Sequence, residues 1–168
     1  NEHSKKLEAC RKIIVNSILE NIRDSLGKLG IVFDDWFSES MLFEGNLVDK
    51  TIARLKETGK TIKKDGALMF NDDEPRVLIK SNGEYTYFAS DLAYHDKKMR
   101  EFDRVINIWG ADHHGYVNRV CKGLESLGHD IDKLDIHLIQ FANLYRGKEK
   151  VSMSTRKGEF LELDTLLK

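Results

Sequence analysis

The stretch "RVINIWGADHHGYVNRVCKGLESLG", residues 104–128, decides the fold. Its first six residues form a short apolar run that is typical of a buried strand. From residue 116 to residue 127, apolar side chains recur every three or four positions, which indicates an amphipathic helix. A second apolar run, "IHLIQF" at 136–141, follows. This order of strand, helix and strand predicts a parallel unit in an α/β fold.

The motif "GADHHGY", residues 110–116, joins the predicted strand to the predicted helix. Ligands of open α/β sheets bind at this junction, where free backbone N–H groups favour anions. Asp112 could accept hydrogen bonds from ribose hydroxyls, and Gly110 would let a sugar or purine approach the backbone. Three interpretations are open: a nucleotide or substrate site, a metal site built on Asp-His-His, and a structural turn. The metal interpretation lacks a matching Asp-x-Asp cluster upstream.

The remaining segments predict a helical start and a small antiparallel patch. Apolar residues at helical spacing predict a helix over 7–26 with one buried stripe, and a second helix over 46–59 with Asn46 as its cap and Gly59 at its end. Alternating runs at 66–70, 76–81 and 84–89 predict short strands. Asn82-Gly83 signals a hairpin between the last two runs, and a further hairpin is expected around Gly147.

Composition leaves the partner open but limits the class of protein. The 168 residues include 27 Lys and Arg against 28 Asp and Glu, so no overall basic excess indicates nucleic acid. The two cysteines have no spacing typical of a disulfide framework or zinc site, which favours a reducing, cytoplasmic compartment. No apolar run approaches the roughly 20 residues that span a bilayer, so we expect a soluble protein without a membrane partner.

A second candidate site is the loop "KVSMSTRKGEF", residues 150–160. Its small hydroxyl side chains and the cations Arg156 and Lys157 could grip a triphosphate through charge-assisted hydrogen bonds. A solvated basic loop is the alternative.

A third candidate is "YTYFASDLAYHDKK", residues 85–98. Asp91 lies there among aromatic residues, including Tyr87 and Tyr94, at an expected strand-to-helix junction. A helix N-cap is one interpretation of Asp91. The other is cation recognition, because a carboxylate beside aromatic faces suits a guanidinium or ammonium group.

Three stretches together resemble the class I arginyl-tRNA synthetase family: "VLIKSNGEYTYFASDLAYHDKK", "FDRVINIWGADHHGY" and "VSMSTRKGEF". "FDDWFSES" and "DGALMF" fit the same family's upstream pattern, so the resemblance covers nearly the whole chain. It implies an α/β fold that is a partial Rossmann-like doubly wound parallel sheet, with a mainly helical N-terminal connecting region and a small antiparallel patch. The implied division is 1–86 for the connecting region and 87–168 for the C-terminal half of the catalytic domain.

The resemblance also implies roles for individual residues. Asp91 would hold the guanidinium of arginine, and the arginine pocket would include Tyr87, Asp91, Tyr94, His113 and His114. The ATP site would include Gly110, Asp112, Val151, Met153 and Ser154. The phosphate-steadying loop, Ser152 to Arg156 with Lys157, would supply the catalytic groups Ser154, Arg156 and Lys157. No metal ligand is expected among them.

The chain departs from the family pattern at two points. Thr155 replaces the loop's usual second lysine, so Arg156, Lys157 or another lysine must meet the phosphate charge. The His-x-Gly-His turn of class I synthetases is missing, and "SLGH" at 126–129 imitates only its second half. The chain also starts without methionine and stops within a predicted helix. We therefore expect the chain to be a fragment of a longer, monomeric enzyme, and we expect the fragment alone to make little product.

The implied parent activates L-arginine with ATP and Mg²⁺ and transfers it to tRNA(Arg), with activation requiring the transfer RNA. Alternatives are a nucleotidyltransferase of the same superfamily, an Asp-His-His metal phosphoesterase, and a non-catalytic module in which helices 7–26 and 46–59 bind a partner.

Overall fold

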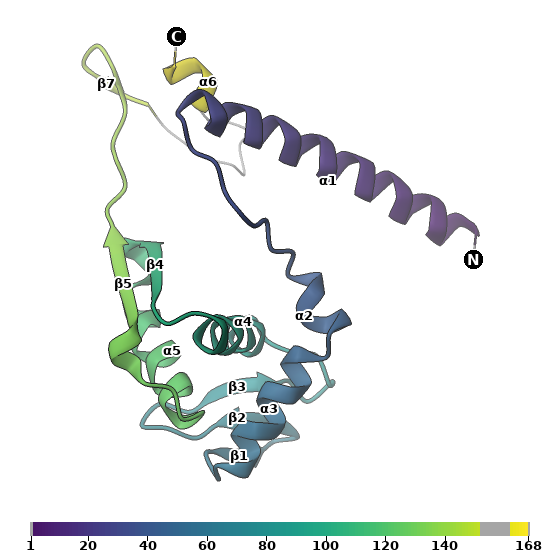
Figure 1. Cartoon of the computed structure of the whole chain (residues 1–168). Coiled ribbons are helices and arrows are strands. Elements are labelled where there is room, and N and C mark those ends of the chain that lie inside the picture. The colour runs from purple at the N-terminus through teal and green to yellow at the C-terminus, as the bar shows by residue number, and fades with distance from the viewer. Residues whose placement is uncertain (1, 152–161, 168) are drawn as a thin grey trace. The chain divides into compact units, whose positions relative to one another are not determined.

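The computed structural model of the chain describes residues 2–151 and 162–167 (Figure 1). The chain forms two compact units, one made of Asn1–Trp36 with Asn143–Lys168 and the other of Phe37–Ala142. Each unit is described by itself.

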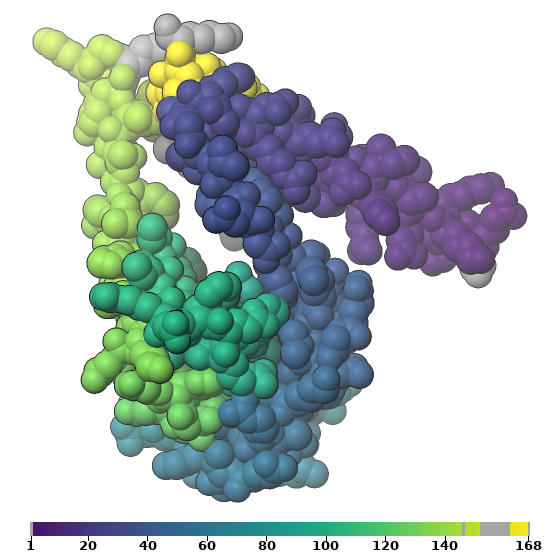
Figure 2. Space-filling model, in the orientation of Figure 1, coloured from purple at the N-terminus to yellow at the C-terminus, as the bar shows by residue number. Residues whose placement is uncertain are grey.

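The first unit is built on the long helix α1 (Glu2–Lys28), which confirms the predicted helix over 7–26. The predicted buried stripe is wrong: no residue of α1 is buried, and Leu7 and Ile14 are 67% and 59% exposed. Within this unit, α6 (Leu163–Leu166) covers only the C-terminal end of α1 (Figure 2). Asp164 there accepts a hydrogen bond from Lys28 Nζ at 2.7 Å. The stripe therefore has no partner along most of its length among the described residues of this unit.

The predicted hairpin around Gly147 is confirmed. Strands β6 (Tyr145–Arg146) and β7 (Glu149–Lys150) pair antiparallel on either side of it, and Gly147 has φ +63°. Positive φ is the backbone conformation that glycine adopts without steric cost.

The second unit contains most of the secondary structure. In chain order its elements are α2 (Ser40–Glu44), α3 (Leu47–Glu57), β1 (Thr61–Lys64), β2 (Ala67–Phe70), β3 (Arg76–Ile79), α4 (Tyr87–Glu101), β4 (Val105–Gly110), the 3₁₀ turn η1 (Ala111–His113), α5 (His114–Ser126), the 3₁₀ turn η2 (Ile131–Lys133) and β5 (Leu134–Ile139). Helix α3 confirms the prediction over 46–59. Asn46 occupies the N-cap position, but with φ +52° its side chain makes no capping hydrogen bond.

The antiparallel sheet has the order β1-β2-β3. The sequence analysis missed β1, whose hairpin with β2 turns at Asp65-Gly66, where φ is +50° and +77°. The predicted strand over 84–89 is wrong. Only Tyr85 pairs with β3, through an isolated bridge to Ile79, and Thr86 then caps α4 with its side chain. The N-cap interpretation of Asp91 is wrong for the same reason, because α4 starts four residues earlier.

The predicted parallel unit is confirmed. Strands β4 and β5 pair in parallel from Val105↔Leu134 to Gly110↔Ile139, with α5 between them in the chain. The chain is therefore α/β, with a two-stranded parallel sheet and a three-stranded antiparallel sheet in this unit.

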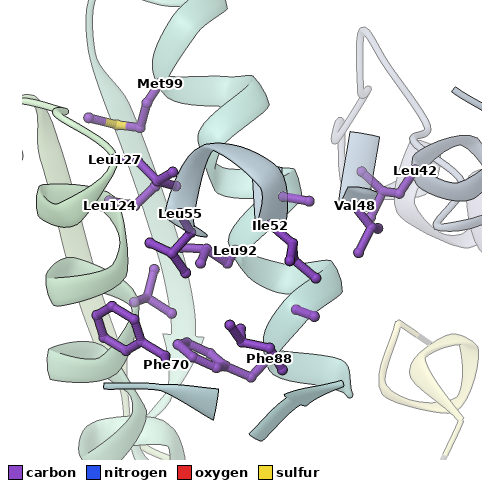
Figure 3. Packing of buried hydrophobic residues seen from close by; sticks show 14 of the residues in the cluster. Leu42, Val48, Ile52, Leu55, Phe70, Phe88, Leu92, Met99, Leu124 and Leu127 are labelled. Carbon is purple, nitrogen blue, oxygen red and sulfur yellow. The ribbon is translucent and has the colours of Figure 1, made fainter. Parts of the chain in front are cut away.

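Helix α4 lies at the centre of the core of this unit (Figure 3). Leu92 of α4 is fully buried, as are Leu55 of α3 and Leu124 of α5. Gly123 of α5 makes the close approach possible, because a Cβ at this position would lie 2.7 Å from Leu92 Cδ1. The packing fixes the rotation of α4, and with it the direction in which its polar face points.

Candidate functional site

One face of α4 lines a pocket of about 410 Å³ together with β4 and the start of α5. The residues of that face are Asp91, Tyr94, His95 and Lys98, at positions i, i+3, i+4 and i+7 of the helix. Side chains at this spacing lie one above another on a helix. The other lining residues are Ile108, Trp109, Gly110, His113 and Tyr116. The structure thus brings Asp91, Tyr94, His113 and Gly110, all predicted site residues, to one pocket.

Asp91 is held by a tyrosine that the sequence analysis did not single out. Tyr116 Oη donates a hydrogen bond to Asp91 Oδ2 at 2.7 Å. Burial, followed by the hydrogen bond to Asp91, raises the pKa of Tyr116 well above its usual value, so the phenol stays protonated and keeps its proton to donate. Asp91 Oδ1 accepts no hydrogen bond from the residues that the structure describes.

A second set of hydrogen bonds links the Asp91 backbone to His95, Asn107 and Lys98. His95 Nδ1 lies 2.7 Å from the Asp91 carbonyl oxygen, and Asn107 Nδ2 lies 2.8 Å from His95 Nε2. Because the amide Nδ2 can only donate, His95 Nε2 accepts and Nδ1 carries the proton. Asn107 Oδ1 in turn accepts from Lys98 Nζ at 2.6 Å. These hydrogen bonds therefore fix the neutral tautomer of His95 and the position of the Lys98 ammonium.

The two basic groups of this hydrogen-bond network, His95 and Lys98, have lowered pKa values. Burial, assisted by the nearby charge of Lys98, lowers the pKa of His95 to about 4. Burial lowers the pKa of Lys98 to about 8, against the opposing attraction of Asp91. Lys98 Nζ also lies 4.6 Å from the centre of the Tyr94 ring, a distance typical of a cation–π contact.

Asp91 and Tyr94 also line a second pocket, of about 390 Å³. Its remaining lining residues are Phe37, Glu39, Leu42, Tyr87 and Ser90. Tyr94 stacks on Phe37 with ring centres 4.6 Å apart, and Glu39 accepts a hydrogen bond from Ser90 Oγ at 3.0 Å. The predicted site residue Tyr87 is 84% exposed at the edge of this pocket. Asp91 therefore stands between two aromatic-lined hollows.

The "GADHHGY" motif lies where β4 ends and α5 begins, as predicted. Asp112, His113 and His114 are exposed to solvent, and the ring of His113 lies 6.4 Å from that of Trp109. The Asp112 carboxylate folds back against Gly110, so closely that a Cβ at Gly110 would collide with Asp112 Oδ1. Asp112 and His114 line neither pocket that contains Asp91. Within residues 2–151 and 162–167, no three His, Cys, Asp or Glu side chains form a group that could hold a metal ion.

The phosphate-loop residues cannot be placed in the same way. Ser152, Met153, Ser154, Thr155, Arg156 and Lys157 lie outside the described residues. Val151, the last residue described before them, belongs to the first unit, where its N–H donates to the Leu144 carbonyl oxygen at 2.9 Å.

Comparison with known proteins decides the family. The family model for the catalytic domain of class I (R) tRNA synthetases matches residues 1–168, the whole chain. The chain belongs to this synthetase family. An arginine–tRNA ligase from Thioalkalivibrio sulfidiphilus is 51% identical to it over 158 residues, and another from Legionella pneumophila is 50% identical over the same length.

Solved structures of the synthetase family share the fold. A putative arginyl-tRNA synthetase from Campylobacter jejuni matches 90% of the chain with a TM-score of 0.81 and 32% identity. An arginyl-tRNA synthetase from Plasmodium falciparum matches 80% of the chain with a TM-score of 0.71, at 17% identity. The chain spans only part of these relatives, 27% of the first ligase and 34% of the Campylobacter jejuni protein. No helix within the described part of the chain is long and apolar enough to cross a membrane.

The sequence analysis missed Glu39, Lys98 and Tyr116, which line the two pockets, and Asn107, which contacts His95 and Lys98. The helical spacing of 91, 94, 95 and 98 would have brought in Lys98 if α4 had been predicted to start at Tyr87. Glu39, Asn107 and Tyr116 come from other elements, and their approach to α4 depends on tertiary packing that no local pattern reports.

Proposed function

We propose that the chain is a catalytic-domain segment of an arginyl-tRNA synthetase. The enzyme would activate L-arginine with ATP and transfer it to tRNA(Arg). The family match over the whole chain supports this proposal, and so does the share of the relatives that the chain spans, 27% and 34%. A segment of that size would not by itself complete the reaction.

The Asp91 carboxylate carries the proposal. It faces a pocket of arginine-compatible size and chemistry, with one oxygen anchored by Tyr116 and the aromatic rings of Tyr94 and Trp109 nearby. A guanidinium ion is planar and donates pairs of parallel hydrogen bonds to a carboxylate, and it also stacks on aromatic faces. Asp91 would bind the guanidinium, with Tyr87, Tyr94, His113 and His114 around the amino acid.

The nucleotide would bind at the carboxyl end of β4. Gly110 would allow the ribose to approach the backbone, and Asp112 would accept its hydroxyl hydrogen bonds. The adenine would meet Val151 and Met153, and the phosphates, with their Mg²⁺, would meet Ser154, Arg156 and Lys157. In this proposal β4, α5 and β5 form part of a Rossmann-like doubly wound sheet, residues 1–86 form the connecting region, and the enzyme is a cytoplasmic monomer.

The chemistry is an in-line displacement. An oxygen of the arginine carboxylate attacks the α-phosphorus of ATP, the bond from that phosphorus to the bridging oxygen breaks, and pyrophosphate leaves. A ribose hydroxyl of the transfer RNA then attacks the carbonyl carbon and releases AMP. The protein would contribute orientation and electrostatic stabilisation of the phosphoryl charge, without a covalent nucleophile.

Arginine-dependent exchange of pyrophosphate into ATP tests the proposal. The full-length protein that carries this chain is assayed with transfer RNA present, offering arginine, lysine and citrulline. Citrulline has nearly the shape of arginine without its charge, so exchange with arginine alone would support recognition of a guanidinium. No exchange with arginine would contradict the proposal. Manganese-dependent hydrolysis of a phosphodiester would then point to the metal phosphoesterase alternative.

A further inference from the structure

We infer that Tyr116 is a positioning residue for the proposed arginine pocket, holding the Asp91 carboxylate so that Oδ1 faces the guanidinium. The inference rests on the proposed function and adds to it a residue from a different helix. Tyr116 is the third residue of α5, whereas Asp91 belongs to α4, so their 2.7 Å hydrogen bond joins the two helices at the wall of the pocket.

The ring of Tyr116 is fixed from two sides. Phe88 packs edge-on against it with ring centres 6.2 Å apart and an interplanar angle of 80°. The ring of Trp109 is tilted relative to the ring of Tyr116, with ring centres 5.9 Å apart. A tyrosine has only two side-chain torsions, and these contacts limit both, so the hydroxyl is delivered to one place. A fixed donor directs a carboxylate that could otherwise rotate about its own Cβ–Cγ bond.

The hydroxyl can serve Asp91 in only one way. A protonated phenol donates to an ionised carboxylate, which has no proton to offer in return. This bond occupies Oδ2 and leaves the lone pairs of Oδ1 for a ligand.

A rival cation lies in the same pocket. Lys98 lines it together with Asp91, yet its ammonium donates to Asn107 Oδ1 at 2.6 Å and lies against the ring of Tyr94. With Tyr116 anchoring Asp91 and Asn107 anchoring Lys98, the two opposite charges are held in separate contacts. Asp91 thus remains available to a cation from outside the chain.

The test is Tyr116→Phe in the full-length synthetase, assayed by pyrophosphate exchange with arginine and ATP varied in turn. The change keeps both ring contacts and removes only the hydroxyl. Because a hydrogen bond to a charged group is lost, we expect the KM for arginine to rise about tenfold or more. The kcat and the KM for ATP should stay within about threefold, the pattern of lost ground-state binding.

Tyr85→Phe is the matched control. It also removes a tyrosine hydroxyl that donates to an aspartate, Asp49, but Tyr85 lines neither pocket that contains Asp91. Its kinetic constants should match those of the unchanged enzyme. A double variant tests whether Tyr116 acts through Asp91. In an Asp91→Asn background, adding Tyr116→Phe should change the KM for arginine by less than about twofold, because the two residues act as one unit.

The outcomes separate the inference from the proposed function. If Asp91→Asn raises the KM for arginine but Tyr116→Phe does not, or if Tyr116→Phe lowers kcat and raises both KM values together, the inference is overturned and the proposed function stands. If Asp91→Asn leaves the KM for arginine unchanged, both are overturned.

Discussion

Arg54 of α3 donates a hydrogen bond to the Asp96 carboxylate of α4 at 2.7 Å, and this carboxylate is fully buried. Asp96 also accepts from His129, which follows α5, at 2.6 Å, and forms an ion pair with Arg100 at 2.8 Å. One buried carboxylate thus joins α3, α4 and the segment that follows α5, and it neighbours the pocket residue His95 in the sequence. The pocket depends on this arrangement, because it fixes how α4 sits.

Replacing Asp96 with alanine should destabilise the chain severely. The change leaves Arg54 and His129 without their buried partner, a loss that typically costs about 3–5 kcal/mol. Urea unfolding of the 168-residue chain, followed by circular dichroism, measures it. Asp135→Asn is the control, because it breaks the solvent-exposed pair with Arg104 and should leave the midpoint almost unchanged. Equal effects of the two changes would show that the Asp96 cluster has no special role.

Acid should weaken the fold in two separate pH ranges. His95 has its pKa lowered from 6.5 to about 4, so the unfolded chain binds a proton that the folded chain does not. Stability is therefore lost as the pH falls from 6.5 towards 4, by about 3 kcal/mol over the whole range. For Asp96, burial raises the pKa, but the hydrogen bonds from His129 and Arg54 and the charge of Arg100 together lower it by more. The net pKa therefore lies below the ordinary value of 3.8. Its contribution is lost only below about pH 4.

The variant His95→Gln separates the two ranges. Its unfolding free energy should fall less than that of the unchanged chain between pH 6.5 and pH 4, while both should weaken alike below that. Urea titrations at pH 7, 4.5 and 3.5 give the comparison. Parallel curves throughout would mean that His95 titrates alike in the folded and unfolded chain.

Gly123 and Gly115 offer a matched pair within α5. Gly123→Ala places a methyl group 2.7 Å from Leu92 Cδ1, so the core must shift, at a typical cost of about 1–3 kcal/mol. Gly115 has open space around it, and Gly115→Ala should be neutral or stabilise by up to about 1 kcal/mol through helix propensity. The difference between their urea midpoints is the measurement. A Gly123→Ala chain as stable as the original would contradict the close packing of α4 on α5.

Gly110 lines the Asp91 pocket, yet Gly110→Ala should affect nucleotide binding through its contact with Asp112. Gly110 has φ −65° and ψ +145°, a conformation that alanine also adopts, so its backbone is not strained. The new Cβ would instead push the Asp112 carboxylate from its place. If Asp112 binds the ribose, the KM for ATP should rise about fivefold, the equivalent of one hydrogen bond. A raised KM for arginine with an unchanged KM for ATP would contradict the proposed role of Asp112.

The local patterns of the sequence predicted the elements that hold the site. The apolar run at 104–109 and the helical spacing over 116–127 correctly predicted β4, α5 and their parallel connection to β5. The interpretation failed at 84–89, where alternating aromatic residues suggested a strand. There Thr86 caps a helix, and its hydroxyl accepts a hydrogen bond from the Ala89 N–H. Phe88 of this run is buried in the core, with its ring 6.2 Å from that of Phe70. This tertiary packing, together with the Thr86 cap, outweighs the local preference of aromatic residues for strands.

Contacts between distant residues could not be predicted. Asp96 lies in the charged run "HDKK", which on composition alone reads as solvated surface, yet it is fully buried because Arg54, Arg100 and His129 converge on it from α3, α4 and the segment after α5. Likewise Tyr116 seemed to be only the end of the "GADHHGY" motif. Its meeting with Asp91 depends on the crossing of α4 and α5, which Gly123 and Leu92 set.

The most direct test of the central claim is the KM for arginine of Asp91→Asn in the full-length synthetase, measured by pyrophosphate exchange beside the unchanged enzyme and Asp135→Asn. The replacement has nearly the same shape and loses the charge that would pair with the guanidinium. We expect the KM for arginine to rise at least about 30-fold, with the KM for ATP within about threefold. An unchanged KM for arginine would contradict the assignment of this pocket to arginine.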